Sequence, residues 1–142
     1  EYILKNVLDQ IKDLYDYIII DCPPSLNILT VNAMTAADSV IVPIQCEYYA
    51  LEGLSQLIHT INLIQDRLNN DLEIDGIDSR TNLSSDVVEN VKSNVHINIY
   101  DTVIPRNVRL AEAPSFGLPI HMYDGKSAGA VTYKNLAKEI IK

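Results

Sequence analysis

Short, continuously apolar runs alternate along this sequence with segments in which apolar residues recur every three or four positions. YIII at 17–20 and VIVPI at 40–44 are such runs, whereas 50–69 carries leucines and isoleucines at helical spacing. Strands that are apolar at every position are typical of parallel sheets covered on both faces. The alternation therefore predicts an α/β fold, a parallel sheet with helices on both faces in three layers.

One domain, residues 1–142, is expected, because no repeat or linker interrupts the alternation. Asn27 or Ser25 is the expected cap of the second helix, and Pro43 is expected at an irregular point or near the end of its strand. The expected strands are 15–20, 39–45, one beginning at 72–77, and 100–105. The expected helices are 1–14, 25–38, 50–69, 84–95 and 127–142.

The net charge of −8 on 142 residues hides an asymmetry. Residues 1–101 carry 5 basic and 16 acidic side chains, a balance of −11, whereas 102–142 carry 6 and 3, a balance of +3. An acidic body is not typical of a dedicated nucleic-acid binder, although a local basic patch stays open. No apolar run approaches the roughly 20 residues of a membrane span, so no membrane partner is expected.

The two cysteines, Cys22 and Cys46, lie far apart and lack the spacing of a metal or iron–sulfur site. We expect them to be small buried thiols. Unpaired cysteines favour a reducing compartment, which agrees with a cytoplasmic protein.

The stretch IIIDCPPS, residues 18–25, joins an apolar run to Asp21 and then to two prolines. In open parallel sheets ligands bind beyond the carboxyl ends of the strands, and a carboxylate there suits Mg²⁺ in a phosphate site. Pro23 and Pro24 would end the strand and stiffen the turn. The alternative is an Asp that caps a helix or stabilises a turn.

Three long blocks, 15–61, 78–92 and 102–140, resemble the ParA/Soj family of DNA-partitioning ATPases, which belong to the deviant-Walker P-loop group. They carry the motifs IIIDCPPS, DSRTNL and VIPRNV in the family's order. The resemblance implies a P-loop NTPase-like fold, ATP and Mg²⁺ as cofactors, and an ATP-bound homodimer that binds non-specific DNA. It also implies a ParB-type protein that stimulates hydrolysis, and a cytoplasmic, nucleoid-associated location.

The resemblance also implies roles for single residues. Asp21 would act in catalysis by holding Mg²⁺ through water, and Pro105, Arg106 and Asn107 would border the adenine. A guanidinium plane can stack on a purine, although Pro105 and Arg106 taken alone also fit a turn that ends a strand. Arg80 and Arg109 would contact DNA phosphates, and Lys126 and Lys134 are weaker candidates for the same role. The alternative for all four is an ordinary solvated side chain.

The family's phosphate-binding loop, G-x-x-x-x-G-K-[ST], is not found in the 142 residues. The chain is therefore interpreted as a partial P-loop ATPase domain that lacks the N-terminal Walker A and switch I segment. Alone, it should not hydrolyse ATP. In the family the strand expected to begin at 72–77 continues for several apolar residues, so the resemblance also implies that the strand is cut short where Asp78 directly follows Ile77. Untraced residues, a truncation or a decayed gene product would each explain this.

Two other function classes remain open. The chain could be a non-enzymatic fragment that binds partners through a sheet edge or helix. It could also come from a MinD-like sibling ATPase that cycles on membranes, but the final segment YKNLAKEIIK lacks the long basic and apolar tail that this requires.

Overall fold

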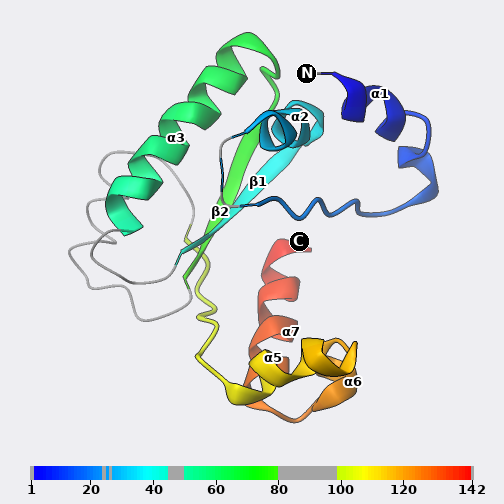
Figure 1. Cartoon of the computed structure of the whole chain (residues 1–142), viewed down its shortest axis with the longest axis vertical. Helices are drawn as coiled ribbons and strands as arrows, with labels where there is room; N and C mark the ends of the chain where they lie inside the picture. The colour runs from blue at the N-terminus through cyan, green and yellow to red at the C-terminus, as the bar shows by residue number, and fades with distance from the viewer. Residues whose placement is uncertain (1, 24, 26, 45–49, 80–98, 142) are drawn as a thin grey trace. The chain divides into compact units, whose positions relative to one another are not determined.

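The computed structural model describes residues 2–23, 25, 27–44, 50–79 and 99–141 (Figure 1). They form two compact units, each described by itself here. The first unit is Glu1–Val40 with Glu52–Ile74, and the second is Ile41–Leu51 with Asp75–Lys142. The expected helix at 84–95, Cys46 and Arg80 lie outside the described residues.

Two strands, β1 at Ser39–Ile44 and β2 at Glu73–Ser79, pair in a parallel sheet. They begin side by side, where the N–H of Glu73 donates to the carbonyl oxygen of Asp38 at 3.0 Å. Together with the helices, these parallel strands confirm the predicted α/β class. Pro43 lies next to the last residue of β1, as predicted for a residue without a backbone donor.

The second strand runs further than its sequence suggested. β2 continues to Ser79, with Ile77 and Asp78 both buried, so the strand does not end at Ile77. Ile99 adds an isolated parallel bridge to Ile77.

The first unit contains α1 at Ile3–Leu8, a 3-10 helix at Lys12–Leu14, α2 at Ile28–Ala36 and most of α3 at Ala50–Arg67. The expected single helix over 1–14 is wrong beyond Leu8. The N–H groups of Gln10 and Ile11 donate to carbonyls three residues back, so the turn tightens and the α-helix ends. α1 packs against α2 (Figure 1).

The long helix α3 confirms the predicted 50–69 helix. Its buried residues recur at intervals of four, three and three, which places them on one stripe of the helix. They are Leu54, Ile58, Ile61 and Ile64. With Ala33 and Met34 of α2 and Leu72, they supply the buried apolar residues of the first unit.

Asn69 follows α3 and ties it to α2 in the same unit. Its buried side-chain amide donates to the carbonyl oxygens of Met34 at 3.0 Å and Ala37 at 2.8 Å. These two carbonyls belong to the end of α2, where intrahelical donors run out. Asn69 therefore satisfies acceptors that burial would otherwise leave unpaired.

The second unit is mainly helical, with α5 at Val108–Glu112, a 3-10 helix at Ala113–Phe116, α6 at Ile120–Tyr123 and α7 at Ala128–Ile140. α7 confirms the predicted closing helix, and Ser127 caps it by accepting from the N–H of Ala130. Gly129 lets α5 and α7 approach closely, because a Cβ there would lie 2.6 Å from Cγ of Leu110.

Two predicted strands are wrong. Residues 15–20 form no strand, and Ile19 is 92% exposed, because no described segment pairs with this stretch. Residues 100–105 also form no strand, since the N–H groups of Asp101 and Thr102 donate to a side chain of α7.

The prediction that Cys22 is a buried thiol is also wrong, because Cys22 is exposed.

None of the described helices is long and apolar enough to cross a membrane.

We expect Asn69→Ala to lower the free energy of unfolding by about 1–3 kcal/mol, because it leaves two carbonyls of the α2 terminus without their donor. Chemical denaturation of the purified protein measures this loss. Asn70→Ala is the matched control, since Asn70 is the same residue type, is exposed and directly follows Asn69. Equal stability of the two variants would contradict the role given to Asn69.

Candidate functional site

Asp21 lies in the first unit, at the end of the extended segment that precedes α2. Its side chain is exposed, as are those of its neighbours Cys22 and Pro23. The accessibility that a metal ligand needs is present. Strand pairing does not set its direction, because residues 15–20 form no strand.

The turn after Asp21 is anchored to the first turn of α2 by three polar side chains. Oδ1 of Asn27 accepts from the N–H groups of Leu29 at 2.9 Å and Thr30 at 3.2 Å, which confirms Asn27 as the helix cap. Nδ2 of Asn27 donates to Oγ of Ser25 at 2.9 Å, and Oγ1 of Thr30 donates to the carbonyl oxygen of Ser25 at 2.7 Å. A movement of this turn would therefore pull on the start of α2.

Thr30 is a residue that the sequence alone did not reveal. It is buried, and its hydroxyl is the link between α2 and the turn. A threonine in the first turn of the expected helix, five positions after a serine, is the signal that could have found it.

A single exposed carboxylate suits Mg²⁺ only if other ligands complete the shell. Mg²⁺ is usually held by one or two carboxylates together with waters and substrate phosphates. Asp21 fits that pattern as one ligand, directly or through water. Across the part of the chain that the structure describes, no group of three or more His, Cys, Asp or Glu side chains could hold a metal by itself.

The predicted base-side residues lie in the second unit, between Ile104 and α5. Pro105 is half-buried and Arg106 is exposed. Asn107 caps α5, because its Oδ1 accepts from the N–H of Arg109 at 2.8 Å. A nucleotide base could meet the exposed Arg106 side chain. The side-chain carbonyl oxygen of Asn107 is engaged by the N–H of Arg109.

The segment before this loop is held by α7. Oε2 of Glu139 accepts from the N–H of Asp101 at 3.0 Å, and Oε1 accepts from the N–H of Thr102 at 3.0 Å and from its hydroxyl. Next to these bonds, Tyr100, Ile104 and Leu136 form a buried core cluster. Burial raises the pKa of Tyr100, and the nearby Asp75 carboxylate raises it further. The hydroxyl of Tyr100 therefore stays protonated and neutral at ordinary pH.

Arg109, a predicted DNA contact, is already surrounded by acidic side chains. Its Nη1 lies 3.0 Å from Oε2 of Glu112, and its Nε lies 3.5 Å from Oδ2 of Asp124. The hydroxyl of Tyr123 also donates to Oε2 of Glu112 at 3.0 Å. Hydrogen bonds to Glu112 and then Tyr123 raise the pKa of Arg109. A DNA phosphate would have to compete with these carboxylates.

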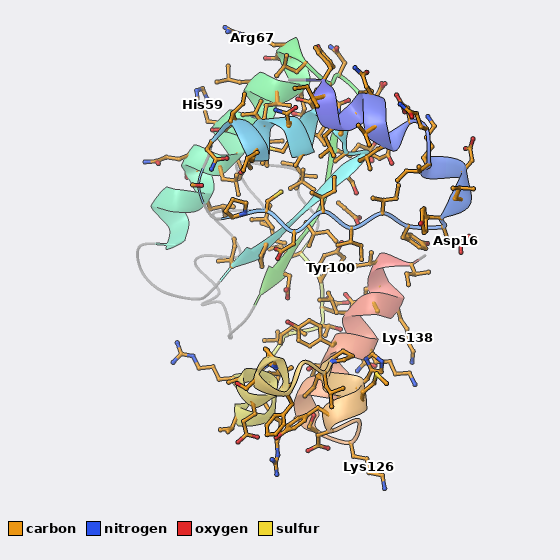
Figure 2. The ribbon with its side chains drawn as sticks, turned by 45° about the vertical axis from the view of Figure 1, so that its right-hand side comes forward. Asp16, His59, Arg67, Tyr100, Lys126 and Lys138 are labelled. Atoms are coloured by element: carbon orange, nitrogen blue, oxygen red, sulfur yellow. The ribbon has the colours of Figure 1, made fainter. Side chains whose placement is uncertain are left out.

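In the described part of this unit, neither lysine candidate forms an ion pair of the kind that Arg109 makes. Lys126 lies in the turn before α7, and both it and Lys134 are exposed. Figure 2 shows the Lys126 side chain extending away from the ribbon. Within the second unit, the structure brings Asn107 and Arg109 together through the cap, whereas Asp21 lies in the first unit.

Known proteins of one family match nearly the whole sequence. Residues 1–74 match the model of the AAA_31 family, described as an AAA domain. Soj of Bacillus subtilis (strain 168), a sporulation initiation inhibitor protein, is 59% identical over 142 residues, covering 96% of this chain and 56% of Soj. The chromosome partitioning protein ParA of Myxococcus xanthus is 53% identical, covering all of this chain and 52% of ParA.

A solved structure supports the same fold. Cobyrinic acid a,c-diamide synthase from Mycobacterium smegmatis, crystallised with an ATP analogue and magnesium, is 36% identical with a TM-score of 0.73. The match covers 96% of this chain and 51% of the synthase. The chain thus spans about half the length of the relatives it matches. Its fold and its similarity to Soj and ParA show that it belongs to the ParA/Soj family of P-loop ATPases.

Proposed function

We propose that the protein containing this chain is a chromosome-partitioning ATPase that hydrolyses ATP with Mg²⁺. ATP binding drives formation of a homodimer, the dimer binds DNA without sequence preference, and a ParB-type protein stimulates hydrolysis and release. The protein acts in the cytoplasm on the nucleoid. The 142 residues alone do not hydrolyse ATP, because they contain no glycine-rich phosphate loop.

The observation that carries this proposal is the similarity to Soj and ParA over nearly the whole chain, at 59% and 53% identity. The amide-forming chemistry in the name of the M. smegmatis synthase is less favoured, since identity to that protein is 36%. Its bound ATP analogue and magnesium support the nucleotide and the metal proposed here.

Asp21 and Arg106 are assigned complementary tasks. The exposed Asp21 carboxylate holds the water shell of Mg²⁺, the ion that neutralises charge on the phosphates when it is bound. The exposed guanidinium of Arg106 stacks on the adenine face, with Pro105 beside it. The Asn27-capped turn after Asp21 passes a change at the phosphates to α2, since Ser25 and Thr30 join the two.

Arg109 and Lys126, with Arg80, make the DNA contacts of the proposal. Contacts of this kind go to phosphates, so they give affinity without sequence readout. The acidic neighbours of Arg109 oppose its contact with DNA and make it weaker than that of an unhindered arginine.

Asp21→Asn in the full-length protein removes the charge but keeps the size of the side chain. We expect ATP hydrolysis to fall roughly 10- to 100-fold, the range found when an outer ligand of a metal site is removed. Steady-state ATPase assays over a magnesium titration measure the change. Asp16→Asn is the control, because Asp16 is also exposed and lies in the same segment. If Asp21→Asn hydrolyses ATP at the parent rate, Asp21 is not a metal ligand.

Replacing Lys126 by Ala should weaken binding of the ATP-bound dimer to random-sequence duplex DNA. The slope of log affinity against log salt should become less steep by about 0.9 for each DNA phosphate that the variant no longer neutralises. Arg109→Ala should have a smaller effect, because Glu112 and Asp124 already engage the guanidinium. Fluorescence anisotropy at several salt concentrations measures both, with Lys12→Ala in the first unit as control. An unchanged salt slope in both variants would show that neither Lys126 nor Arg109 contacts DNA phosphates.

A further inference from the structure

The loop Pro105–Asn107 is fixed by the segment that precedes it, and this segment is not a strand. After the bridge between Ile99 and Ile77, the N–H of Tyr100 donates to the carbonyl oxygen of Ile77 at 3.1 Å. Residues 100–107 then carry no helix or strand assignment. Side chains must therefore hold the backbone there.

Tyr100 holds the start of the segment by packing on a glycine. The side chain is 4% exposed, and a Cβ at Gly76 would lie 2.8 Å from two atoms of its ring. A side chain at position 76 would push this ring away, so the glycine allows the ring to approach β2 closely. Because the ring is buried with Ile104 and Leu136, the chain on both sides of Asp101 is attached to the core of the unit.

Glu139 holds the middle of the segment. Its two carboxylate oxygens accept from two consecutive backbone N–H groups, those of Asp101 and Thr102, each at 3.0 Å. The hydroxyl of Thr102 donates to the same carboxylate. Hydrogen bonds to a charged acceptor are about twice as strong as those between neutral groups, and two adjacent amides fix the orientation of the peptide plane between them.

The same side of α7 packs on the segment. Leu136 lies one turn before Glu139, and Leu136 is buried against Tyr100 and Ile104 while Ile140 packs at its edge. α7 thus contributes a charged contact and an apolar contact to a segment that ends at Pro105. Downstream, Asn107 is fixed as the cap of α5.

We propose that Glu139 is a positioning residue for the nucleotide base. It holds the backbone at Asp101 and Thr102 so that Pro105 and Arg106 present a preformed surface to adenine. The inference rests on the proposed function. It adds that helix α7 determines the selectivity for the base and not the affinity for the phosphates.

Glu139→Ala in the full-length protein tests this inference. If the base-side loop is then in its binding conformation only about a tenth of the time, affinity for ATP falls roughly tenfold. Binding of inorganic tripolyphosphate, which has no base, stays within about twofold of the parent, since a preformed base surface acts only on ligands that carry a base. Isothermal titration calorimetry with each ligand and magnesium measures both affinities, and GTP reports whether the preference for adenine disappears.

A second measurement reports the contact itself. Hydrogen exchange followed by NMR should show reduced protection of the Asp101 and Thr102 amides in Glu139→Ala. Glu139→Gln keeps one acceptor oxygen and should fall between Ala and the parent. Asn135→Ala, a change at an exposed position of the same helix, should leave both the amides and the affinities unchanged.

The outcomes separate the two proposals. A parent protein that binds neither ATP nor tripolyphosphate would overturn the proposed function, and this inference with it. A parent that binds ATP, with Glu139→Ala binding it equally well despite exposed amides, would overturn the inference alone. An equal loss of ATP and tripolyphosphate affinity would also overturn it, because general destabilisation does not select for the base.

Discussion

The second unit depends on one interaction, the pair of hydrogen bonds from the Asp101 and Thr102 amides to Glu139. A backbone that leaves a sheet loses the regular hydrogen-bond partners of its N–H groups. Glu139 supplies those partners from α7, and Leu136 packs beside it on the buried Tyr100 and Ile104. The course of the chain into Pro105 and Arg106 is thereby fixed, and α5 can begin at the Asn107 cap.

In the first unit, short uncharged side chains hold the backbone outside the sheet. Asn27, Ser25 and Thr30 join the turn after Asp21 to the start of α2, and Asn69 satisfies the carbonyls at the end of the same helix. α2 is thus held at both ends by polar contacts. In the proposed ATPase this makes α2 the natural element to respond when the turn after Asp21 changes, since a rigid helix transmits displacement along its length.

Patterns within short stretches of sequence predicted the elements that depend mainly on residues close together in the chain. Periodicity over 50–69 found α3, the cap preference of Asn27 found α2, and the apolar runs found β1 and β2. The strands at 15–20 and 100–105 were predicted wrongly, because a strand needs a partner and apolar composition does not say whether one is present. The family motifs identified Asp21 and Pro105–Asn107 as candidates, but the contacts of Glu139 with Thr102 and of Arg109 with Asp124 join residues whose proximity only the folded chain reveals.

The central claim is that the loop at Pro105–Asn107 borders the adenine of bound ATP. Photolabelling of the full-length protein with 8-azido-ATP and magnesium, followed by peptide mapping, tests it directly. The account predicts that the label, displaced by excess ATP, lies on residues 102–109. A label that ATP displaces equally well but that maps to other parts of the chain would contradict it.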